Sequence, residues 1–518
     1  MPQGNGAAAA NGRKRYERSS SQPENPFASL IPEQQIAIVP EFTLESGVKL
    51  HNVPVAYTTR GELNAAGDNA MVICHALTGS ADVSDWWGPL LGGPGRAFDT
   101  SRFFVVCMNS LGSPYGTASP VTAKDGDPSK GRYGPEFPLT TIRDDVQLHK
   151  LILHDLGVKQ VAAVIGGSLG GMFVLEWAYL GREYVRCVVP IATSSRHSAW
   201  GISWGEAQRQ SIYADPKYDD GYYSFDDPPV TGLGAARMSA LLTYRSRNSF
   251  ESRFGRNVPD PSKIQTIRER PRPSTPSEAH FHIHNDGHVV KRSPLSRNGS
   301  ESGSSTPATA AATTTTTTIT PGTTTMTTTP TTTTTSNGLQ FTESPDPQFC
   351  GPARASLGGV DKMPTSTYFS AQSYLRYQGS KFVKRFDGNC YIAMTRKLDT
   401  HDVSRHRAES IAAALALIEQ PLLVMGIESD GLFTFAEQEE IARHASNARL
   451  ERIESQEGHD AFLLQFEQVN RSILRFLHEV LPDIMAAKGT AAPEEAQVGQ
   501  VAKSSVFGEA EVEDITAW

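Results

Sequence analysis

Short apolar runs and longer amphipathic stretches alternate along much of this chain. The runs are rich in β-branched residues and stand at 71–75, 103–108, 160–165, 185–192 and 421–427. Their length and composition predict buried strands. The stretch 141–157 instead carries apolar residues at helical spacing and ends in Gly157, a typical C-cap. Buried strands that alternate with amphipathic helices predict an α/β fold with a mostly parallel sheet.

The two ends of this alternating region have their own patterns. Residues 35–59 are expected to form short strands, with turns at 45–47 and 51–54. They predict an antiparallel pair leading into a mixed sheet. A last strand is expected at 449–454, followed by a final helix over 458–480.

The alternation stops after residue 192 and resumes at 421. Helices are expected there without intervening strands, at 203–212, 232–245 and 374–383. The pattern predicts a helical lid inserted over the sheet. Within it, residues from about 259 to 344 contain long threonine runs and few large apolar side chains, so this insert is expected to be disordered.

These patterns divide the chain into core, lid and tails. The α/β core is expected in two parts, 25–195 and 416–485, on either side of a lid at 196–415. The small and polar stretches 1–24 and 486–518 are expected to be disordered tails.

Composition narrows the class of protein. The net charge of −8 gives no long-range attraction to nucleic acid or to anionic membranes. No apolar run approaches the roughly 20 residues that span a bilayer, and the first thirty residues lack an apolar signal core. Cys74, Cys107 and Cys187 lie in apolar runs, where buried free thiols are expected. We therefore expect a soluble cytoplasmic protein without nucleic-acid or membrane partners.

One strand–helix junction carries the clearest chemical signal. The apolar run 160–165 ends in Gly166-Gly-Ser168-Leu169-Gly170, and a helical stretch follows. Gly-x-Ser-x-Gly occurs by chance in many chains, but between a strand and a helix it is typical of a nucleophile elbow. Ser168 is the predicted nucleophile, and the N–H of Leu169 is expected to face a developing oxyanion. A dinucleotide fingerprint would need glycine in place of the serine, and a P-loop would need a Lys-Ser/Thr pair.

A serine nucleophile needs a base whose tautomer is fixed by a carboxylate. In α/β-hydrolases these residues follow in the order Ser, acid, His, each at the end of a strand. Asp430 follows one predicted strand and His459 follows the last. His401, beside Asp402, is a rival base, but it lies in the predicted lid. The predicted triad is therefore Ser168, Asp430 and His459.

The loop after the strand at 71–75 is the expected source of a second oxyanion amide. It has the small-residue sequence Ala-Leu-Thr-Gly, in which the N–H of Leu77 can act whatever its side chain. An ordinary loop between a strand and a helix is the alternative interpretation.

Four histidines cluster in the threonine-rich insert, namely His280, His282, His284 and His288. No thiolate or carboxylate spacing accompanies them, so no metal site is predicted.

Several segments, the elbow among them, share a resemblance to one family. They are His75-Ala-Leu-Thr-Gly79, Asn109-x-Leu-Gly112, Gly166-Gly-Ser-Leu-Gly-Gly-Met172-x-x-Leu-Glu-Trp177, Gln208-Arg-Gln210, Ala236-Arg-Met238, Leu242-Thr-Tyr-Arg245, Ser429-Asp-x-Leu-Phe433 and Gly458-His-Asp460. Together they resemble the homoserine O-acetyltransferase family over residues 25–481, without the threonine-rich insert. The resemblance implies an α/β-hydrolase fold with a helical lid, and usually a homodimer.

The resemblance also implies a reaction and its residues. Members of the family move an acetyl group from acetyl-CoA to the homoserine hydroxyl by a ping-pong route, on the way to methionine, with no permanently bound cofactor. The family's triad falls on Ser168, Asp430 and His459. Its substrate-carboxylate arginine falls on Arg237, and the acid that holds the substrate amine falls on Asp460. These charges suit a zwitterionic acceptor, although Arg237 could instead be solvated and Asp460 could merely cap the last helix.

The leading interpretation is homoserine O-acetyl transfer through an acyl-enzyme at Ser168. Serine O-acetyl transfer and homoserine O-succinyl transfer on the same scaffold are alternatives, as is an esterase or thioesterase with the same triad. The complete Ser, Asp and His set argues against a hydrolase-fold binding protein without activity.

Overall fold

The central element of the fold is a mixed β-sheet. The computed structural model describes residues 16–19, 21–258, 275–288, 369–487 and 489. The strands of the sheet are β1 (Glu17–Ser19), β2 (Gln35–Thr43), β3 (Lys49–Arg60), β4 (Ala70–Cys74), β7 (Phe104–Met108), β8 (Val161–Gly167), β9 (Val185–Ile191), β10 (Leu422–Ile427) and β11 (Ala448–Ile453). Within the described residues, these nine strands lie in the order β1-β2-β3-β7-β4-β8-β9-β10-β11.

The sheet changes from antiparallel to parallel at β7. Strands β1, β2, β3 and β7 pair antiparallel, whereas every neighbouring pair from β7 to β11 is parallel. A separate pair of short strands, β5 (Leu91–Gly92) and β6 (Phe98–Asp99), is also parallel. The predicted α/β class with a mostly parallel sheet is confirmed, and so is the antiparallel start.

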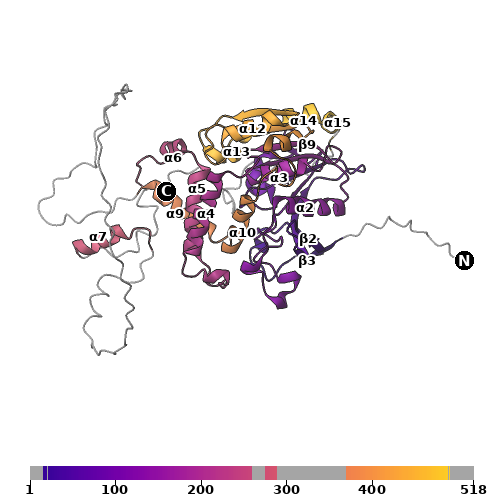
Figure 1. The fold of residues 1–518 in the computed structure, drawn as a ribbon. Coiled ribbons are helices and arrows are strands. Elements are labelled where there is room, and N and C mark those ends of the chain that lie inside the picture. The colour runs from indigo at the N-terminus through magenta and orange to yellow at the C-terminus, as the bar shows by residue number, and fades with distance from the viewer. Residues whose placement is uncertain (1–15, 20, 259–274, 289–368, 488, 490–518) are drawn as a thin grey trace, which may run out of the picture. The chain divides into compact units, whose positions relative to one another are not determined.

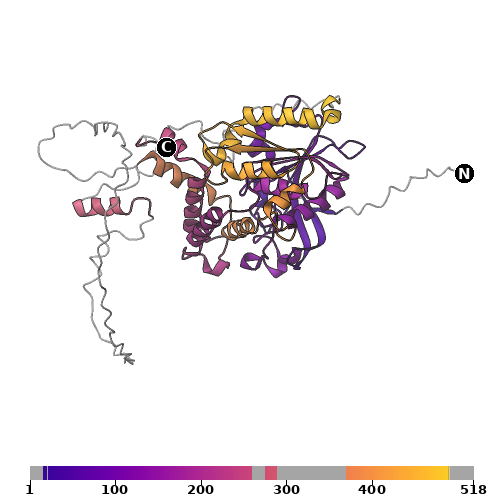
Figure 2. The ribbon, with the colours of Figure 1, turned by 45° about the horizontal axis from the view of Figure 1, so that its top comes forward.

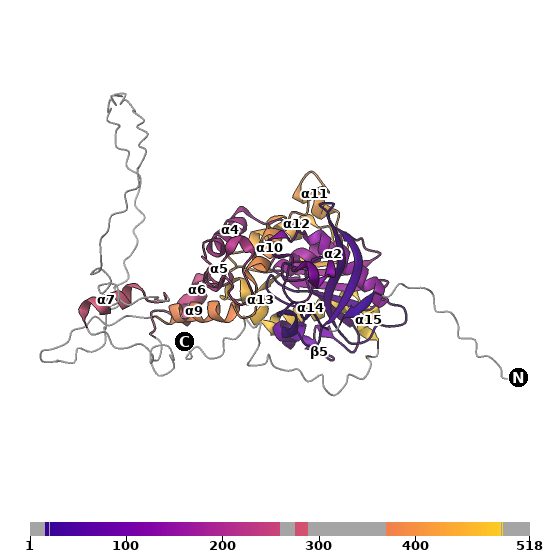
Figure 3. The same ribbon diagram turned by 90° about the horizontal axis from the view of Figure 1, so that it is seen from below.

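Helices cover both faces of the sheet. The helices of the core are α1 (Val83–Trp87), α2 (Ile142–Leu156), α3 (Leu169–Ala178), α11 (Ile411–Ala416), α12 (Phe435–His444), α13 (Ala461–Leu464), α14 (Phe466–Val480) and α15 (Pro482–Ala486). Figure 3 shows α2, α11 and α12 on one side of the strands and α14 and α15 on the other. The long yellow helix α14 also lies along the sheet in Figure 2.

Alternating side chains of each strand explain the two layers. On β4, Val72 belongs to one buried apolar cluster together with side chains of α2 and α3. Its neighbours Met71 and Ile73 belong to a second cluster, which includes side chains of α1 and α14. Both faces of the central strands are therefore dry, as expected for a parallel sheet.

Helix α2 shows why the sequence forms its elements where it does. Thr141 and Asp144 form a capping box at its first turn, and Gly157 ends it in the left-handed conformation at φ 97°. These two signals set the length of the helix that leads back to β8. Gly157 ends the helix as expected.

Five of the described helices between β9 and β10 form the lid. They are α4 (Ala199–Tyr213), α5 (Val230–Tyr244), α6 (Arg247–Arg253), α9 (Ser370–Phe382) and α10 (Gly388–Asp399). Figure 1 shows α4, α5, α9 and α10 gathered beside the sheet. The expected helices at 203–212, 232–245 and 374–383 correspond to α4, α5 and α9. Helices α6 and α10 were not expected, although Asp387 caps α10 through Cys390 N.

Three expectations depart from the structure at the ends of elements. Strand β1 lies inside the range 1–24, because Arg18 and Tyr16 bond to Asp155 and tie this segment to the sheet edge. Strand β3 continues through the expected turn at 51–54, because β2 pairs with it on both sides of Asn52. The final helix is broken into a 3-10 turn, η8 (Gly458–Asp460), followed by α13 and α14.

A second unit of the chain, residues 269–367, is described only at residues 275–288. The described part of it contains a helix, α7 (Pro276–His284), inside the insert expected to be disordered. Thr275 caps this helix by accepting from Glu278 N, a signal that composition alone conceals. The rest of the range 259–344 lies outside the described residues.

Two further sequence expectations can be compared with the described residues. Cys74, Cys107 and Cys187 are buried free thiols, as expected. Among the described residues, no helix is long and apolar enough to cross a bilayer.

Candidate active site

Ser168 stands at a strained turn between β8 and α3. Its backbone has φ 60° and ψ −126°, which non-glycine residues rarely adopt. The strain is held in place by a bond from Ser168 N to Ile191 O at 2.9 Å and by one from Thr193 Oγ1 to Ser168 O at 2.8 Å. The strand–turn–helix expected of a nucleophile elbow is therefore present.

The glycines of the elbow are required because neighbouring atoms leave no room for a Cβ. A Cβ on Gly170 would lie 2.2 Å from Cys74 O, and a Cβ on Gly166 would lie 2.5 Å from Gly170 O. A Cβ on Gly167 would lie 2.4 Å from the ring of Phe462. The first turn of α3 is thus packed directly against the end of β4, where the expected oxyanion loop begins.

Asp430 and His459 meet although they follow different strands. Asp430 comes after β10 and His459 after β11, and Asp430 Oδ2 lies 2.7 Å from His459 Nδ1. The other carboxylate oxygen accepts from the N–H groups of Leu432 and Phe433, at 2.8 and 3.0 Å. The carboxylate is therefore held in place against Nδ1, the arrangement by which an acid orients a histidine base.

A second contact joins the loop of Asp430 to the loop of His459. Ser429 Oγ accepts from Gly458 N at 3.1 Å and donates to Ser455 O at 2.8 Å. Ser429 directly precedes Asp430, and Gly458 directly precedes His459. The two loops are thus joined at neighbouring positions, which fixes the imidazole relative to the carboxylate.

Aromatic rings surround the imidazole of His459. The ring centroids of Phe433, Phe462 and Tyr244 lie 5.3, 5.6 and 6.1 Å from its own. Phe433 comes shortly after Asp430, Phe462 comes shortly after His459, and Tyr244 ends the lid helix α5. These contacts limit the rotation of the ring and keep it in an apolar setting, where its bond to Asp430 is strengthened.

Leu77 is a central residue of a tight turn after β4. Gly79 N donates to Ala76 O at 3.0 Å and closes this turn. Leu77 occupies its second position, whose N–H is not used by the bond that closes the turn. Because β4 and β8 are neighbours in the sheet, the turn and the elbow both follow strand ends on the same edge. Leu169, the other predicted oxyanion donor, is the first residue of α3.

Arg237 is a buried residue of the lid, rather than a solvated one. Its side chain is 1 % exposed on α5, and its guanidinium lies over the rings of Phe382 and Tyr244 at 4.8 and 5.5 Å. Contacts with two rings limit the motion of the planar guanidinium, which suits bidentate carboxylate binding.

Asp460 is 2 % exposed and lies within a charged cluster. Its Oδ2 is 3.0 Å from Arg245 Nε, and Arg245 Nη1 is 2.7 Å from Glu457 Oε2. Arg253 also pairs with Glu457, at 3.0 Å. The sequence assigned no role to Arg245 or Glu457, although Arg245 ends one of the segments that resemble the family.

His401, the rival base, has the surroundings of a histidine that serves the packing of the fold. His401 Nε2 bonds to Ser194 O at 3.0 Å, and burial lowers its pKa to about 4. Its neighbour Asp402 instead accepts from Ser404 Oγ at 2.6 Å. This pair therefore lacks the geometry of a base oriented by a carboxylate.

The four histidines of the threonine-rich insert lie on or directly after one helix, and His282 Nε2 is 3.9 Å from Glu278 Oε1. His280, His282 and His284 lie on α7, and His288 follows it. In the described ranges, no group of three or more His, Cys, Asp or Glu side chains could hold a metal ion.

Comparison with known proteins places this geometry in a family. A family model described as the alpha/beta hydrolase fold matches residues 69–286. Homoserine O-acetyltransferase of Emericella nidulans is 64% identical over 97% of this chain and 98% of its own. The protein of the same name from Saccharomyces cerevisiae is 56% identical over 95% of this chain and 96% of its own.

Solved structures agree on the fold. A homoserine O-acetyltransferase from Bacillus anthracis matches with a TM-score of 0.60 at 18% identity, covering 88% of this chain and 98% of that one. Esterase E22 matches with a TM-score of 0.60 at 20% identity, covering 86% of this chain and 99% of that one. At such identities these structures support the α/β-hydrolase fold alone. The near-complete coverage at high sequence identity is decisive, and the chain belongs to the homoserine O-acetyltransferase family.

Proposed function

We propose that this protein transfers the acetyl group of acetyl-CoA to the side-chain hydroxyl of L-homoserine through an acyl-enzyme at Ser168. The observation that carries the proposal is the 2.7 Å pair of Asp430 and His459 at the sheet edge where Ser168 occupies its strained turn. High identity to proteins named homoserine O-acetyltransferase supports the choice of substrates.

The first half-reaction acylates the enzyme. Ser168 Oγ attacks the thioester carbonyl while Nε2 of His459 accepts its proton, since Nδ1 faces Asp430. The N–H groups of Leu77 and Leu169 stabilise the tetrahedral oxyanion. The carbon–sulfur bond then breaks, and the CoA sulfur leaves with the proton from His459.

The second half-reaction removes the acetyl group from Ser168 and regenerates the free hydroxyl. The homoserine hydroxyl gives its proton to His459 and attacks the acetyl carbonyl of the acyl-enzyme, forming a second tetrahedral oxyanion in the same hole. The bond to Ser168 Oγ breaks, and His459 returns the proton to it. O-acetylhomoserine leaves, which makes the sequence ping-pong.

The acceptor is bound by opposite charges from two elements. Arg237, on α5, suits the substrate carboxylate, and Asp460, beside the base, suits the substrate amine. Arg245 lies against the same carboxylate at 3.0 Å and orients it for the amine. A lid that excludes water favours the homoserine hydroxyl over hydrolysis.

The proposal extends to the setting of the enzyme. The core is assigned to 25–195 and 416–485 and the lid to 196–415, and the active form is a cytoplasmic homodimer that serves methionine biosynthesis. Acetyl-CoA is a co-substrate, and no cofactor is bound permanently.

The test uses the whole chain with acetyl-CoA, with and without homoserine. We expect a single burst of CoA equal to the enzyme when the acceptor is absent, and sustained release with O-acetylhomoserine when it is present. Intact-mass and peptide analysis should place one acetyl group on Ser168, and Ser168→Ala should abolish both signals while keeping the fold.

Other outcomes would identify the alternatives. Equal CoA release with and without acceptor would favour an esterase or thioesterase. Crossing acetyl-CoA and succinyl-CoA with homoserine and serine tests the remaining transferases. A higher kcat/KM for succinyl-CoA or for serine would overturn the proposed pair of substrates.

A further inference from the structure

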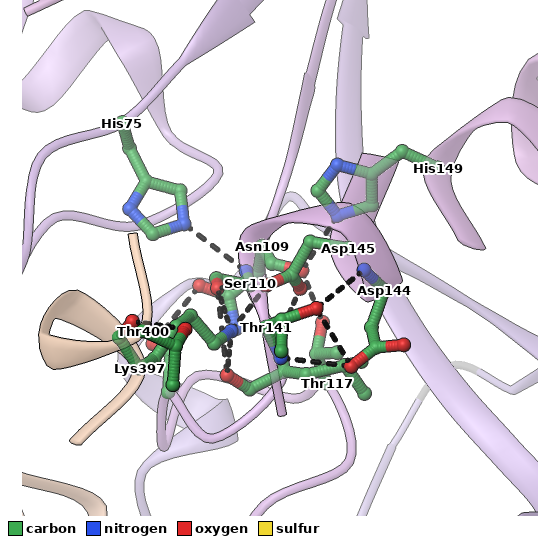
Figure 4. Close-up of polar contacts among 12 residues, drawn as sticks. His75, Asn109, Ser110, Thr117, Thr141, Asp144, Asp145, His149, Lys397 and Thr400 are labelled. Carbon is green, nitrogen blue, oxygen red and sulfur yellow. Dashed lines mark hydrogen bonds and ion pairs between the residues drawn. The ribbon is translucent and has the colours of Figure 1, made fainter. Parts of the chain in front are cut away.

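A buried ion pair joins the lid to the core at a place the mechanism above does not use. Lys397, on the lid helix α10, pairs with Asp145, on α2, and both side chains are 0% exposed. Lys397 Nζ also donates to Ser110 Oγ at 2.7 Å and to Leu111 O at 2.6 Å. Figure 4 shows these groups converging on the loop that follows β7.

Asp145 holds the same loop from the other side. It accepts from Leu111 N at 2.6 Å and from Ser110 Oγ at 3.1 Å. Lys397 and Asp145 therefore bind the side chain of Ser110 and the backbone of Leu111. By holding these two residues they also fix the direction of the N–H of Ser110.

The N–H of Ser110 points at the ring that begins the oxyanion loop. It donates to His75 Nε2 at 3.1 Å, as Figure 4 shows. An Nε2 that accepts must be unprotonated, so the ring proton is on Nδ1. Burial lowers the pKa of His75 to about 4, so the ring is neutral near pH 7. Nδ1 then donates to Ala76 O at 2.8 Å.

The carbonyl of Ala76 and the N–H of Leu77 belong to one peptide unit. This unit is planar and trans, so its oxygen and its amide hydrogen point in opposite directions. By holding Ala76 O, His75 sets the direction of the Leu77 N–H, and donation to the carbonyl makes that N–H a stronger donor. The chain of contacts from the lid thus ends on the expected oxyanion donor.

A second contact from the lid reaches the same turn. Arg385, between α9 and α10, donates to Thr78 O at 3.2 Å. The hydroxyl of Tyr115 in turn donates to Arg385 O at 2.9 Å. Two separate points of the lid therefore hold the turn at Ala76–Gly79.

We infer that Lys397, Asp145, Ser110 and His75 position the oxyanion amide of Leu77, so that the lid helix α10 and the oxyanion hole are set together. The inference rests on the proposed acyl-enzyme. It assigns positioning roles, because none of the four touches the reacting atoms. Stability gives a weaker account of the pair, since buried ion pairs are often replaceable by apolar residues without loss.

The test replaces both charges so that neither is left buried without its partner. The variant Lys397→Met/Asp145→Leu is compared with Arg209→Met/Asp399→Leu, which removes another ion pair of α10, at 2.9 Å, that does not contact the oxyanion loop. The readouts are kcat, the KM for each substrate, thermal unfolding and the infrared carbonyl band of the ¹³C-acetyl group on Ser168. A weaker oxyanion hydrogen bond moves this band to higher frequency.

We expect the Lys397 variant to lose about tenfold in kcat, less than the 10²–10³-fold loss of a whole oxyanion donor, with little change in either KM. Its carbonyl band should move to higher frequency. The Arg209 variant should keep its kcat and its band, whatever the change in its thermal stability. An unmoved band in a folded Lys397 variant would overturn the inference.

Two substitutions of His75 provide a second comparison. The amide of His75→Asn can replace Nδ1 and keep the bond to Ala76 O, whereas His75→Gln can replace Nε2 and keep only the bond to Ser110. We expect the Asn variant to retain more of the band position and of kcat than the Gln variant. The reverse order would contradict the inference. Failure of the wild type to form acetyl-Ser168 would overturn the proposed function, and this inference with it.

Discussion

Nε of Arg245 lies 3.0 Å from Oδ2 of Asp460, and both side chains are 3% exposed. Asp460 directly follows His459, and Arg245 directly follows the lid helix α5. The end of a lid helix is thus bound to the residue beside His459, the predicted base. Glu457 completes the cluster at 2.7 Å from Arg245, so this guanidinium has two carboxylates.

Asp460→Asn should weaken acceptor binding while leaving acylation intact. The amine of homoserine would lose a charge-assisted hydrogen bond, worth about 1.5–3 kcal/mol, which is about a 10–100-fold rise in the KM for homoserine. Arg245 keeps Glu457 as a partner, so we expect the variant to fold. The CoA burst without acceptor should be unchanged, which steady-state and rapid-quench kinetics can measure.

Glu457→Gln is the matched control. It removes the other carboxylate from Arg245, which keeps its contact with Asp460. We expect lower thermal stability and a homoserine KM within about twofold of the wild type, well inside the change that one full hydrogen bond produces. Equal KM changes in the two variants would contradict a specific role for Asp460.

Patterns within a few residues were enough to predict the frame of this site. The strand before Ser168, the glycines around it and the helix after it are local signals, and each appears where expected. The order of strand ends also predicted that Asp430 and His459 would meet. A parallel sheet brings such ends to one edge whatever their separation in sequence.

Contacts between distant polar residues were beyond local patterns. Lys397 and Asp145 are 252 residues apart, and each reads alone as an ordinary charge on an amphipathic helix. Arg245 and Asp460 are likewise far apart in the sequence, and neither residue alone indicates its partner. Only tertiary packing decides that such charges are buried together, because periodicity marks apolar faces and gives no partner for a polar residue. Strand β1 and helix α7 were missed because the tail and the insert were judged by their average composition. A short segment that is paired or capped does not change that average.

Asp430→Asn should keep the fold and remove most of the activity. The amide can still accept from the N–H groups of Leu432 and Phe433, but it cannot hold His459 in the required tautomer. We expect kcat to fall by about 10³–10⁴-fold, as measured by CoA release. The control is Asp402→Asn, beside the rival His401. A similar loss in that variant would contradict the assignment of the base.

Gly170→Ala should destabilise the elbow by direct collision. The new Cβ would lie 2.2 Å from Cys74 O, a backbone atom that cannot move without disturbing β4. We expect a loss of about 1–3 kcal/mol in the free energy of unfolding, measured by denaturant titration. Gly234→Ala on α5 is the control, since its nearest neighbour would be at 3.7 Å. Helix propensity should make it neutral or stabilising by up to about 1 kcal/mol. A stable Gly170→Ala variant would rule out the collision.

The protein should lose stability as the pH falls below about 6.5, the ordinary value for histidine. Burial lowers the pKa of His75, His197 and His401 to about 4 and that of His149 to about 3. These rings are neutral in the folded state, whereas the unfolded chain binds a proton on each below pH 6.5. Unfolding therefore takes up protons between pH 6.5 and 4, and acid favours the unfolded state. Each ring contributes a slope of up to about 1.4 kcal/mol per pH unit in this window.

Denaturant titrations at pH 7, 6 and 5 should show this decline, and His401→Gln should make it shallower. The glutamine amide can still donate to Ser194 O but does not titrate, so one of the four contributions disappears. The control is His444→Gln, which replaces a half-buried histidine of α12 outside this buried set, and the slope of the wild type should remain. A free energy of unfolding that is flat from pH 7 to 5 would mean that these histidines are not held neutral by burial.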